Sequence, residues 1–287
     1  MPVCALPDGA TVTYADQGVG EPLILVHGWA AHGGFFDDHA KRLAASHRVL
    51  TLTLRGHPGS THGALPLTID TLADDIAHFC AALDLTGAVA LGWSMGAMAI
   101  WGAASKLGAR LAGIIVEDMA PRLINDDAWR WGLSGGYGAD DVAGTLAEIE
   151  ADWPAYVGRF APRMFAPAVR ETRPDLINWA VAEMSKAEPA HMGALWASMA
   201  AQDFRAALTA IAQPMLVIHG GESPVYPGEA TQFIARAAPA ATHVTIPSAG
   251  HVPHLEAPDA FFEEVEAFVR TTRRAGLRSG GEVHEAV

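Results

Sequence analysis

A serine lies between two glycines in the segment Gly92-Trp93-Ser94-Met95-Gly96, at the junction of a predicted strand and a predicted helix. The apolar run Ala88 to Leu91 has the length of a short buried strand, and Ala97 to Leu107 is rich in Ala, Met, Ile and Leu, as a helix packed on a sheet is. A turn this sharp needs small flanking residues, and it leaves the serine hydroxyl exposed above the sheet. The pattern therefore predicts a nucleophile at Ser94, beside the free amides that begin the next helix.

Strands and helices alternate on both sides of this segment. Alternation of this kind gives right-handed crossovers and a mostly parallel sheet flanked by helices, which is an α/β fold. The predicted strands are Ala10 to Ala15, Pro22 to Val26, Arg48 to Leu54, Ala88 to Leu91, Leu111 to Val116, Pro214 to Ile218 and Thr242 to Ile246. The predicted helices around them are Phe35 to Ala45, Thr68 to Leu85, Ala97 to Leu107, Gly228 to Ala237, and Ala257 to about Arg273.

The alternation stops between about residues 122 and 200, where helical stretches follow one another without a convincing strand. Five of the eight tryptophans fall in this segment. The expected organisation is a core made of residues 1–121 and 201–275, with 122–200 inserted into it. The Gly-rich, charged residues 276–287 are expected to form a flexible tail.

The charge balance excludes several classes of partner. Lys and Arg total 19 and Asp and Glu total 32, so the formal net charge is −13. That charge repels nucleic acid and anionic membrane surfaces, and we expect neither as a partner. Met1 to Cys4 lacks the basic and apolar segments of a secretion signal, which favours a cytoplasmic protein.

The only two cysteines, Cys4 and Cys80, are too few for a disulfide framework or a zinc site. Cys4 is expected at a frayed N-terminus and Cys80 inside a helix as a small buried apolar residue. No cofactor or metal is predicted.

A serine nucleophile needs a base within hydrogen-bonding distance. Among the 13 histidines, His251 follows the last predicted strand, so it lies over the carboxyl edge of the sheet, where Ser94 also lies. His254, three residues later, is the nearest competitor. His27 is interpreted as a brace for the loop after the Pro22 to Val26 strand.

The base in turn needs a carboxylate that holds it in place. Three carboxylates lie near this edge: Glu117, Asp118 and Glu222. Asp118 is favoured because it is short and follows a strand directly. Glu117 should point to the opposite face, and Glu222 has a longer side chain that could still reach His251.

The oxyanion of an acyl-transfer intermediate needs two donors. The Met95 amide, at the start of the helix, is one candidate. The Trp29 amide is the other, because Gly28 lets the loop after the strand Pro22 to Val26 approach closely.

Together these motifs resemble the α/β-hydrolase fold family, in which serine, carboxylate and histidine follow in that order. Within it, the chain looks most like carboxylesterases of the pimeloyl-carrier methyl ester esterase kind. The resemblance implies that residues 122–200 form a helical cap over the active site. It is carried by His27-Gly28-Trp29, Arg55-Gly56-His57, Gly92-Trp93-Ser94-Met95-Gly96, and Gly250-His251 with Glu256 and Pro258.

Two positions depart from the family pattern. Thr53 occupies a region where relatives usually carry aspartate before the Arg-Gly-His turn, which should alter bracing rather than chemistry. Ser223 occupies the position where relatives commonly place the triad aspartate, and a serine cannot supply that negative charge.

The expected function is hydrolysis of a small or medium-sized apolar carboxylic ester through an acyl-enzyme on Ser94, with His251 as base. A thioester or a lactone fits equally well. Cofactor-free dioxygenation of heteroaromatic substrates is an alternative, although similar enzymes carry histidine where Trp93 stands. A non-catalytic ligand receptor has no positive feature. A carrier-protein substrate is disfavoured by the excess of carboxylates in residues 122–200, and the oligomeric state is left open.

Overall fold

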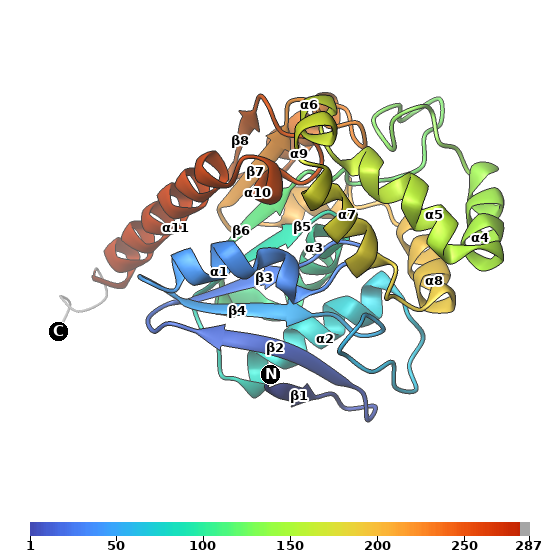
Figure 1. Cartoon of the computed structure of the whole chain (residues 1–287). Coiled ribbons are helices and arrows are strands. Elements are labelled where there is room, and N and C mark those ends of the chain that lie inside the picture. The colour runs from blue at the N-terminus through green and yellow to red at the C-terminus, as the bar shows by residue number, and fades with distance from the viewer. Residues whose placement is uncertain (282–287) are drawn as a thin grey trace.

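A single sheet runs through the protein, whose computed structural model describes residues 1–281, with side chains to residue 272 (Figure 1). Its order is β1-β2-β4-β3-β5-β6-β7-β8. The pairs from β4 to β8 are parallel, and β1 and β2 add antiparallel pairs at one edge. The predicted mostly parallel sheet is confirmed. The strands are β1 Val3–Ala5, β2 Thr11–Gln17, β3 Pro22–Val26, β4 Arg48–Thr53, β5 Ala88–Trp93, β6 Leu111–Glu117, β7 Met215–Gly220 and β8 Ala241–Ile246.

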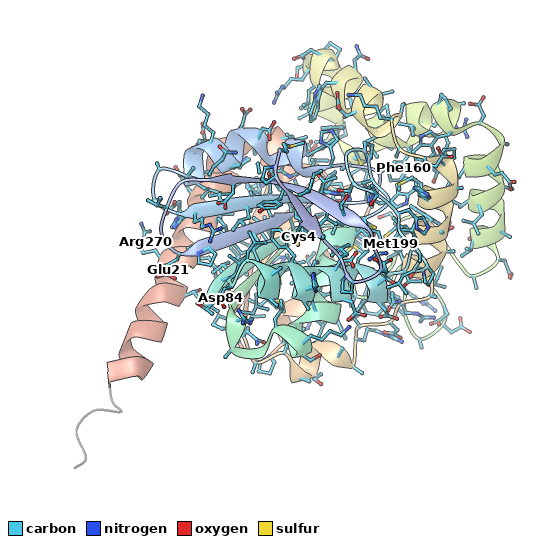
Figure 2. The ribbon with its side chains drawn as sticks, turned by 90° about the horizontal axis from the view of Figure 1, so that it is seen from below. Cys4, Glu21, Asp84, Phe160, Met199 and Arg270 are labelled. Carbon is cyan, nitrogen blue, oxygen red and sulfur yellow. The ribbon has the colours of Figure 1, made fainter. Side chains whose placement is uncertain are left out.

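Helices cover both faces of the sheet. Helix α2 packs on α3 on one face, while α1 and α11 contact each other on the other face (Figure 2). Thr68 caps α2 by accepting a hydrogen bond from the Thr71 amide. These elements are η1 Gly33–Phe36, α1 Asp37–Leu43, α2 Ile69–Ala82, α3 Met95–Leu107, η2 Gly108–Arg110, η4 Ala207–Ala210, α9 Gly228–Ala237, α10 Pro253–Glu256 and α11 Pro258–Gly281.

The two ends of the chain differ from the sequence-based expectation. Cys4 lies in β1 and is only 7% exposed, so the expectation of a frayed N-terminus was wrong. Its strand is only three residues long, too short for a sequence pattern to reveal, and it is ordered by antiparallel pairing with β2. Helix α11 continues to Gly281, beyond the expected end near Arg273, although this stretch contains three glycines, which disfavour a helix. Of the predicted flexible tail, 276–281 are therefore helical and 282–287 lie outside the described residues.

Residues 122–200, called the helical segment below, contain α4 to α8 and one 3-10 turn. Prolines begin α6, α7 and α8, where the missing amide hydrogen is not needed for helical bonding. Figure 2 shows Phe160 and Met199 of this segment on the side away from Glu21 and Asp84, which precede β3 and β5. The segment therefore lies beyond the carboxyl ends of the strands. Its elements are α4 Asp141–Ala151, α5 Trp153–Phe160, η3 Ala161–Met164, α6 Pro167–Thr172, α7 Pro174–Met184 and α8 Pro189–Ala200.

None of the helices within residues 1–281 combines the length and the apolar run that a membrane crossing requires.

Candidate active site

Ser94 occupies a strained turn between β5 and α3. Its backbone angles are φ 53° and ψ −122°, which a residue with a side chain rarely adopts. A Cβ on Gly92 would lie 2.5 Å from the Ala97 nitrogen, and a Cβ on Gly96 would overlap the carbonyl oxygen of Val26. Both flanking glycines are therefore required by the close approach of backbone, as the sequence pattern predicted.

The structure brings Ser94, His251 and Asp118 together in one chain of hydrogen bonds. His251 Nε2 lies 3.0 Å from Ser94 Oγ, and His251 Nδ1 lies 2.7 Å from Asp118 Oδ2. Because a carboxylate can only accept, Nδ1 donates to it and Nε2 is left to accept the serine proton. All three residues are buried, and Ser94 is 9% exposed.

The position of His251 is fixed by its backbone. Its amide donates to the Met164 carbonyl at 2.7 Å, and its own carbonyl accepts from the Trp93 indole at 2.9 Å. The first bond joins the loop that carries His251 to the helical segment, and the second joins it to Trp93 at the end of β5. The imidazole therefore has little freedom to leave Ser94.

Asp118 follows β6 directly and has φ 44°, in the left-handed region. Its Oδ2 accepts from His251 Nδ1 and from the Ser223 hydroxyl at 2.6 Å. Its Oδ1 accepts from His219 Nδ1 at 2.7 Å and from the Gly220 amide at 3.2 Å. Burial alone would raise the pKa of Asp118, but the hydrogen bonds from His219 and His251 outweigh it and lower this pKa. Asp118 is therefore a stable anion beside His251.

The two alternative carboxylates lie elsewhere. Glu117 is fully buried, and its Oε1 accepts from the amide and the Nδ1 of His254, at 2.9 and 2.8 Å. Burial raises the pKa of Glu117 well above its ordinary value. The Glu222 side chain is exposed. Glu117 and the competing base His254 are thus engaged with each other.

The proposed oxyanion donors lie beside Ser94. Met95 is the first residue of α3, so helical bonding does not use its amide. A Cβ on Gly28 would lie 3.2 Å from the Ser94 Cβ, which places the loop after β3 against Ser94. His27 holds this loop: its Nδ1 donates to the Gly28 carbonyl at 2.8 Å and its Nε2 accepts from the Leu54 amide at 3.0 Å. The Trp29 backbone is thereby held near Ser94.

Aromatic rings of the helical segment surround the Trp29 side chain. Trp153, Tyr156, Phe160 and Trp196 lie with ring centroids 5.1 to 6.1 Å from the indole, all edge to face. The indole nitrogen of Trp29 donates to the Met192 carbonyl at 2.9 Å. Tyr156, Phe160 and Trp196 also line a cavity of about 170 Å³. The surroundings of the candidate oxyanion loop are therefore largely aromatic.

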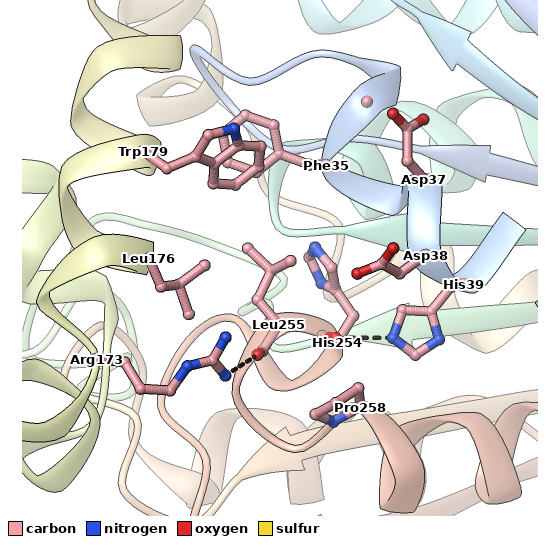
Figure 3. Close-up of a pocket in the computed structure, with 11 residues that line it drawn as sticks. Phe35, Asp37, Asp38, His39, Arg173, Leu176, Trp179, His254, Leu255 and Pro258 are labelled. Atoms are coloured by element: carbon pink, nitrogen blue, oxygen red, sulfur yellow. Dashed lines mark hydrogen bonds between the residues drawn. The ribbon is translucent and has the colours of Figure 1, made fainter. Parts of the chain in front are cut away.

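A second cavity, of about 300 Å³, lies between α7 and the start of α1 (Figure 3). The rings of Phe35 and Trp179 pack against each other at one end of it, with centroids 4.6 Å apart, and the Arg173 guanidinium donates to the Leu255 carbonyl at 3.1 Å. Ser94, His251 and Asp118 do not line it. Within the described residues, no three His, Cys, Asp or Glu side chains converge as metal ligands.

Comparison with known proteins agrees with this geometry. The sequence model of the family described as "Alpha/beta hydrolase family" matches residues 23–264. The chain belongs to the alpha/beta hydrolase family.

Two relatives and one solved structure illustrate the similarity. The pimeloyl-[acyl-carrier protein] methyl ester esterase of Nitrosomonas europaea is 26% identical over 258 residues, covering 88% of this chain and 97% of that protein. The enzyme of the same name from Xanthomonas campestris pv. campestris (strain B100) is 30% identical over 263 residues, covering 88% and 96%. The structure of an esterase from Exiguobacterium antarcticum matches with a TM-score of 0.87 at 23% identity, covering 93% and 98%. This alpha/beta hydrolase is of the esterase type.

Two side chains near the active site of this alpha/beta hydrolase were missed by sequence reasoning. His219, one residue past the predicted end of its strand, donates to Asp118. Tyr226, 3% exposed, has its ring centroid 5.5 Å from that of His251. Burial and the Asp118 charge raise the pKa of Tyr226, and a contact with the Ser94 hydroxyl only partly opposes them. Their sequence positions could have indicated both residues. His219 lies at the end of β7 and Tyr226 in the loop that follows, on the edge of the sheet where Ser94 and His251 were expected.

Proposed function

We propose that this alpha/beta hydrolase cleaves a small or medium-sized apolar carboxylic ester through an acyl-enzyme on Ser94. His251 acts as the base and Asp118 as the carboxylate that holds it. The observation that supports this most directly is the chain of hydrogen bonds from Ser94 Oγ through His251 to Asp118, at 3.0 and 2.7 Å, on a strained turn.

In the first half of the reaction, Ser94 Oγ attacks the ester carbonyl carbon while its proton moves to His251 Nε2. The resulting imidazolium is stabilised by the Asp118 charge. The carbonyl oxygen becomes an oxyanion, and the amides of Trp29 and Met95 donate to it. When the tetrahedral intermediate collapses, the C–O bond to the alcohol breaks and the alcohol takes the proton from His251.

In the second half, a water molecule replaces the alcohol. His251 Nε2 takes a proton from the water as its oxygen attacks the acyl carbon, and the same two amides bind the second oxyanion. Collapse releases the carboxylic acid and returns the proton to Ser94. The same steps would hydrolyse a thioester or a lactone, so the choice among these depends on how the substrate is bound.

The preference for an apolar group is supported by what surrounds Trp29, whose amide is a candidate oxyanion donor. The helical segment contributes the rings that enclose Trp29, and we interpret it as a cap over the active site. It contacts the core where the site residues are held, through Met164 on His251 and Met192 on Trp29. Apolar walls with few polar groups suit an apolar acyl or alcohol group.

We propose a free small ester rather than a carrier-bound one, although the two relatives above act on a carrier-protein ester by their names. Residues 122–200 contain 11 carboxylates and 7 Lys or Arg side chains, and the whole chain has a formal charge of −13. An acidic carrier would be repelled by this surface. Turnover of a carrier-bound ester that is saturable, salt-sensitive and far faster than turnover of the free ester would contradict this proposal.

The test is a series of p-nitrophenyl esters of increasing acyl length, with matched lactones and thioesters. It is combined with mass spectrometry of the protein after a fluorophosphonate probe. We expect turnover that rises from short to medium chains and a single label on Ser94. Ser94→Ala should lose the label and at least about 10⁴-fold in kcat. Near wild-type hydrolysis by Ser94→Ala would exclude the serine mechanism.

A further inference from the structure

The Asp118 carboxylate is shared between two histidines. One oxygen, Oδ2, accepts from His251 Nδ1, and the other, Oδ1, accepts from His219 Nδ1, both at 2.7 Å. His219 is only 6% exposed and Asp118 is fully buried. The acyl-transfer steps above need only the bond from His251. They give no reason for a second, equally short bond from His219.

The register of the sheet explains why His219 lies at this place. Glu117 of β6 pairs with Ile218 of β7, and the Asp118 amide donates to the Ile218 carbonyl at 2.9 Å. The residues that follow each of these positions, Asp118 and His219, are therefore neighbours at the carboxyl ends of adjacent strands. In a sheet, such neighbours come from strands far apart in sequence, here separated by 101 residues.

The His219 ring is held from its other side as well. A Cβ on Gly228, at the start of α9, would lie 3.3 Å from His219 Nε2. The ring of His243 on β8 stacks on it with a centroid distance of 6.3 Å. Since α9 and β8 enclose the ring, Nδ1 stays directed at Asp118.

We propose that His219 is a positioning residue for ester hydrolysis, which fixes the Asp118 carboxylate so that Oδ2 faces His251. This inference rests on the proposed function. His219 acts through Asp118 and does not touch the substrate. Its bond is the shorter of the two on Oδ1, since the Gly220 amide lies at 3.2 Å. Without the bond from His219, Asp118 Oδ1 would be buried with only the longer hydrogen bond from the Gly220 amide. That loss favours rotation of the carboxylate away from His251.

Two substitutions at His219 separate a donor role from a packing role. His219→Phe keeps a ring of similar shape but removes the donor. His219→Asn keeps an N–H near the position of Nδ1, because the first atoms of the two side chains superpose. We expect His219→Phe to lose about 10- to 100-fold in kcat with a KM close to wild type, since a small misplacement of catalytic groups costs this much. His219→Asn should retain kcat within about fivefold.

The measurements are kcat and KM on the best p-nitrophenyl ester, with thermal unfolding to verify that each variant is folded. Equal losses in the two variants, or a wild-type kcat in His219→Phe, would overturn the positioning role. If His219→Phe does not fold, the smaller His219→Ala, which also lacks the donor, takes its place, and the same comparison with His219→Asn decides. Failure of the wild type to turn over any ester or take the Ser94 label would instead reject the proposed function.

Discussion

The Ser223 hydroxyl donates a 2.6 Å hydrogen bond to Asp118 Oδ2, the same oxygen that accepts from His251. The side chain at position 223, in the loop after β7, is therefore close to the imidazole Nδ1 of the candidate base. A carboxylate could approach this imidazole from the end of β6 or from the loop after β7. In this chain the end of β6 supplies the charge, and Ser223 supplies a donor to it.

We expect the carboxylate that bonds to His251 to function at position 223 as well as at position 118. Asp118→Asn should lower kcat by about 10⁴-fold, because an amide cannot stabilise the imidazolium and favours the wrong tautomer. Adding Ser223→Asp to that variant should recover at least tenfold, since the new carboxylate starts from a position already next to His251. Both variants are assayed for kcat on one ester.

Glu222→Gln is the matched control, because Glu222 is adjacent in sequence but exposed. It should keep near wild-type kcat. If Glu222→Gln loses orders of magnitude while Asp118→Asn does not, Asp118 is the wrong carboxylate.

Most of the fold, and the meeting of Ser94, His251 and Asp118 at one edge of the sheet, could be predicted from the sequence, because they follow from local patterns. The apolar run Pro22 to Val26 predicts β3 at its observed bounds, and the glycines around Ser94 alone indicate the sharp turn. His219 could not be found in this way, since its role depends on the pairing of β6 with β7. Cys4 was misplaced for a different reason, because β1 is only three residues long and too short to show a strand pattern.

The Tyr226 hydroxyl should contribute to turnover as a neutral donor close to Ser94. Burial and the Asp118 charge raise its pKa, so it stays protonated through the neutral range. Tyr226→Phe should lower kcat/KM by about fivefold, since one hydrogen bond in a buried site is worth about 1 kcal/mol. Tyr14→Phe is the control, because Tyr14 lies on β2 against Phe79. An unchanged kcat/KM in Tyr226→Phe would show that this hydroxyl only fills space.

Replacing a tightly packed glycine by alanine should destabilise the fold, whereas replacing an exposed helical glycine should stabilise it. Gly96→Ala places a Cβ on the Val26 carbonyl, so we expect it to destabilise the fold by about 2 kcal/mol or more and to reduce labelling of Ser94. Gly144, exposed in α4, has no heavy atom within 4 Å of the position that a Cβ would take, and Gly144→Ala should stabilise by about 0.4 to 1 kcal/mol. Chemical denaturation of both variants measures the difference, and equal stabilities would contradict this reading of the turn.

Buried histidines should make the fold sensitive to mild acid. His39 is 2% exposed and its Nε2 donates to the His254 carbonyl at 2.7 Å. Burial, with a smaller contribution from His254, lowers the pKa of His39 from 6.5 to about 4. Between these two values the unfolded chain binds a proton that the folded chain does not. The stability from neutral His39 is therefore fully present above pH 6.5 and is lost as the pH falls towards 4.

His39→Gln removes this proton linkage but keeps an N–H that can reach the His254 carbonyl. The free energy of unfolding of the wild type should fall more steeply than that of the variant between pH 6.5 and 4. The difference should approach about 3 kcal/mol, because each pKa unit is worth about 1.36 kcal/mol. Urea unfolding across this range measures both slopes, and the region from about pH 7 to 8 serves as the reference, since His39 is neutral there in both states. Parallel slopes in the acid range would mean that His39 titrates in the folded protein as it does in the unfolded chain, and that its burial carries no cost in acid.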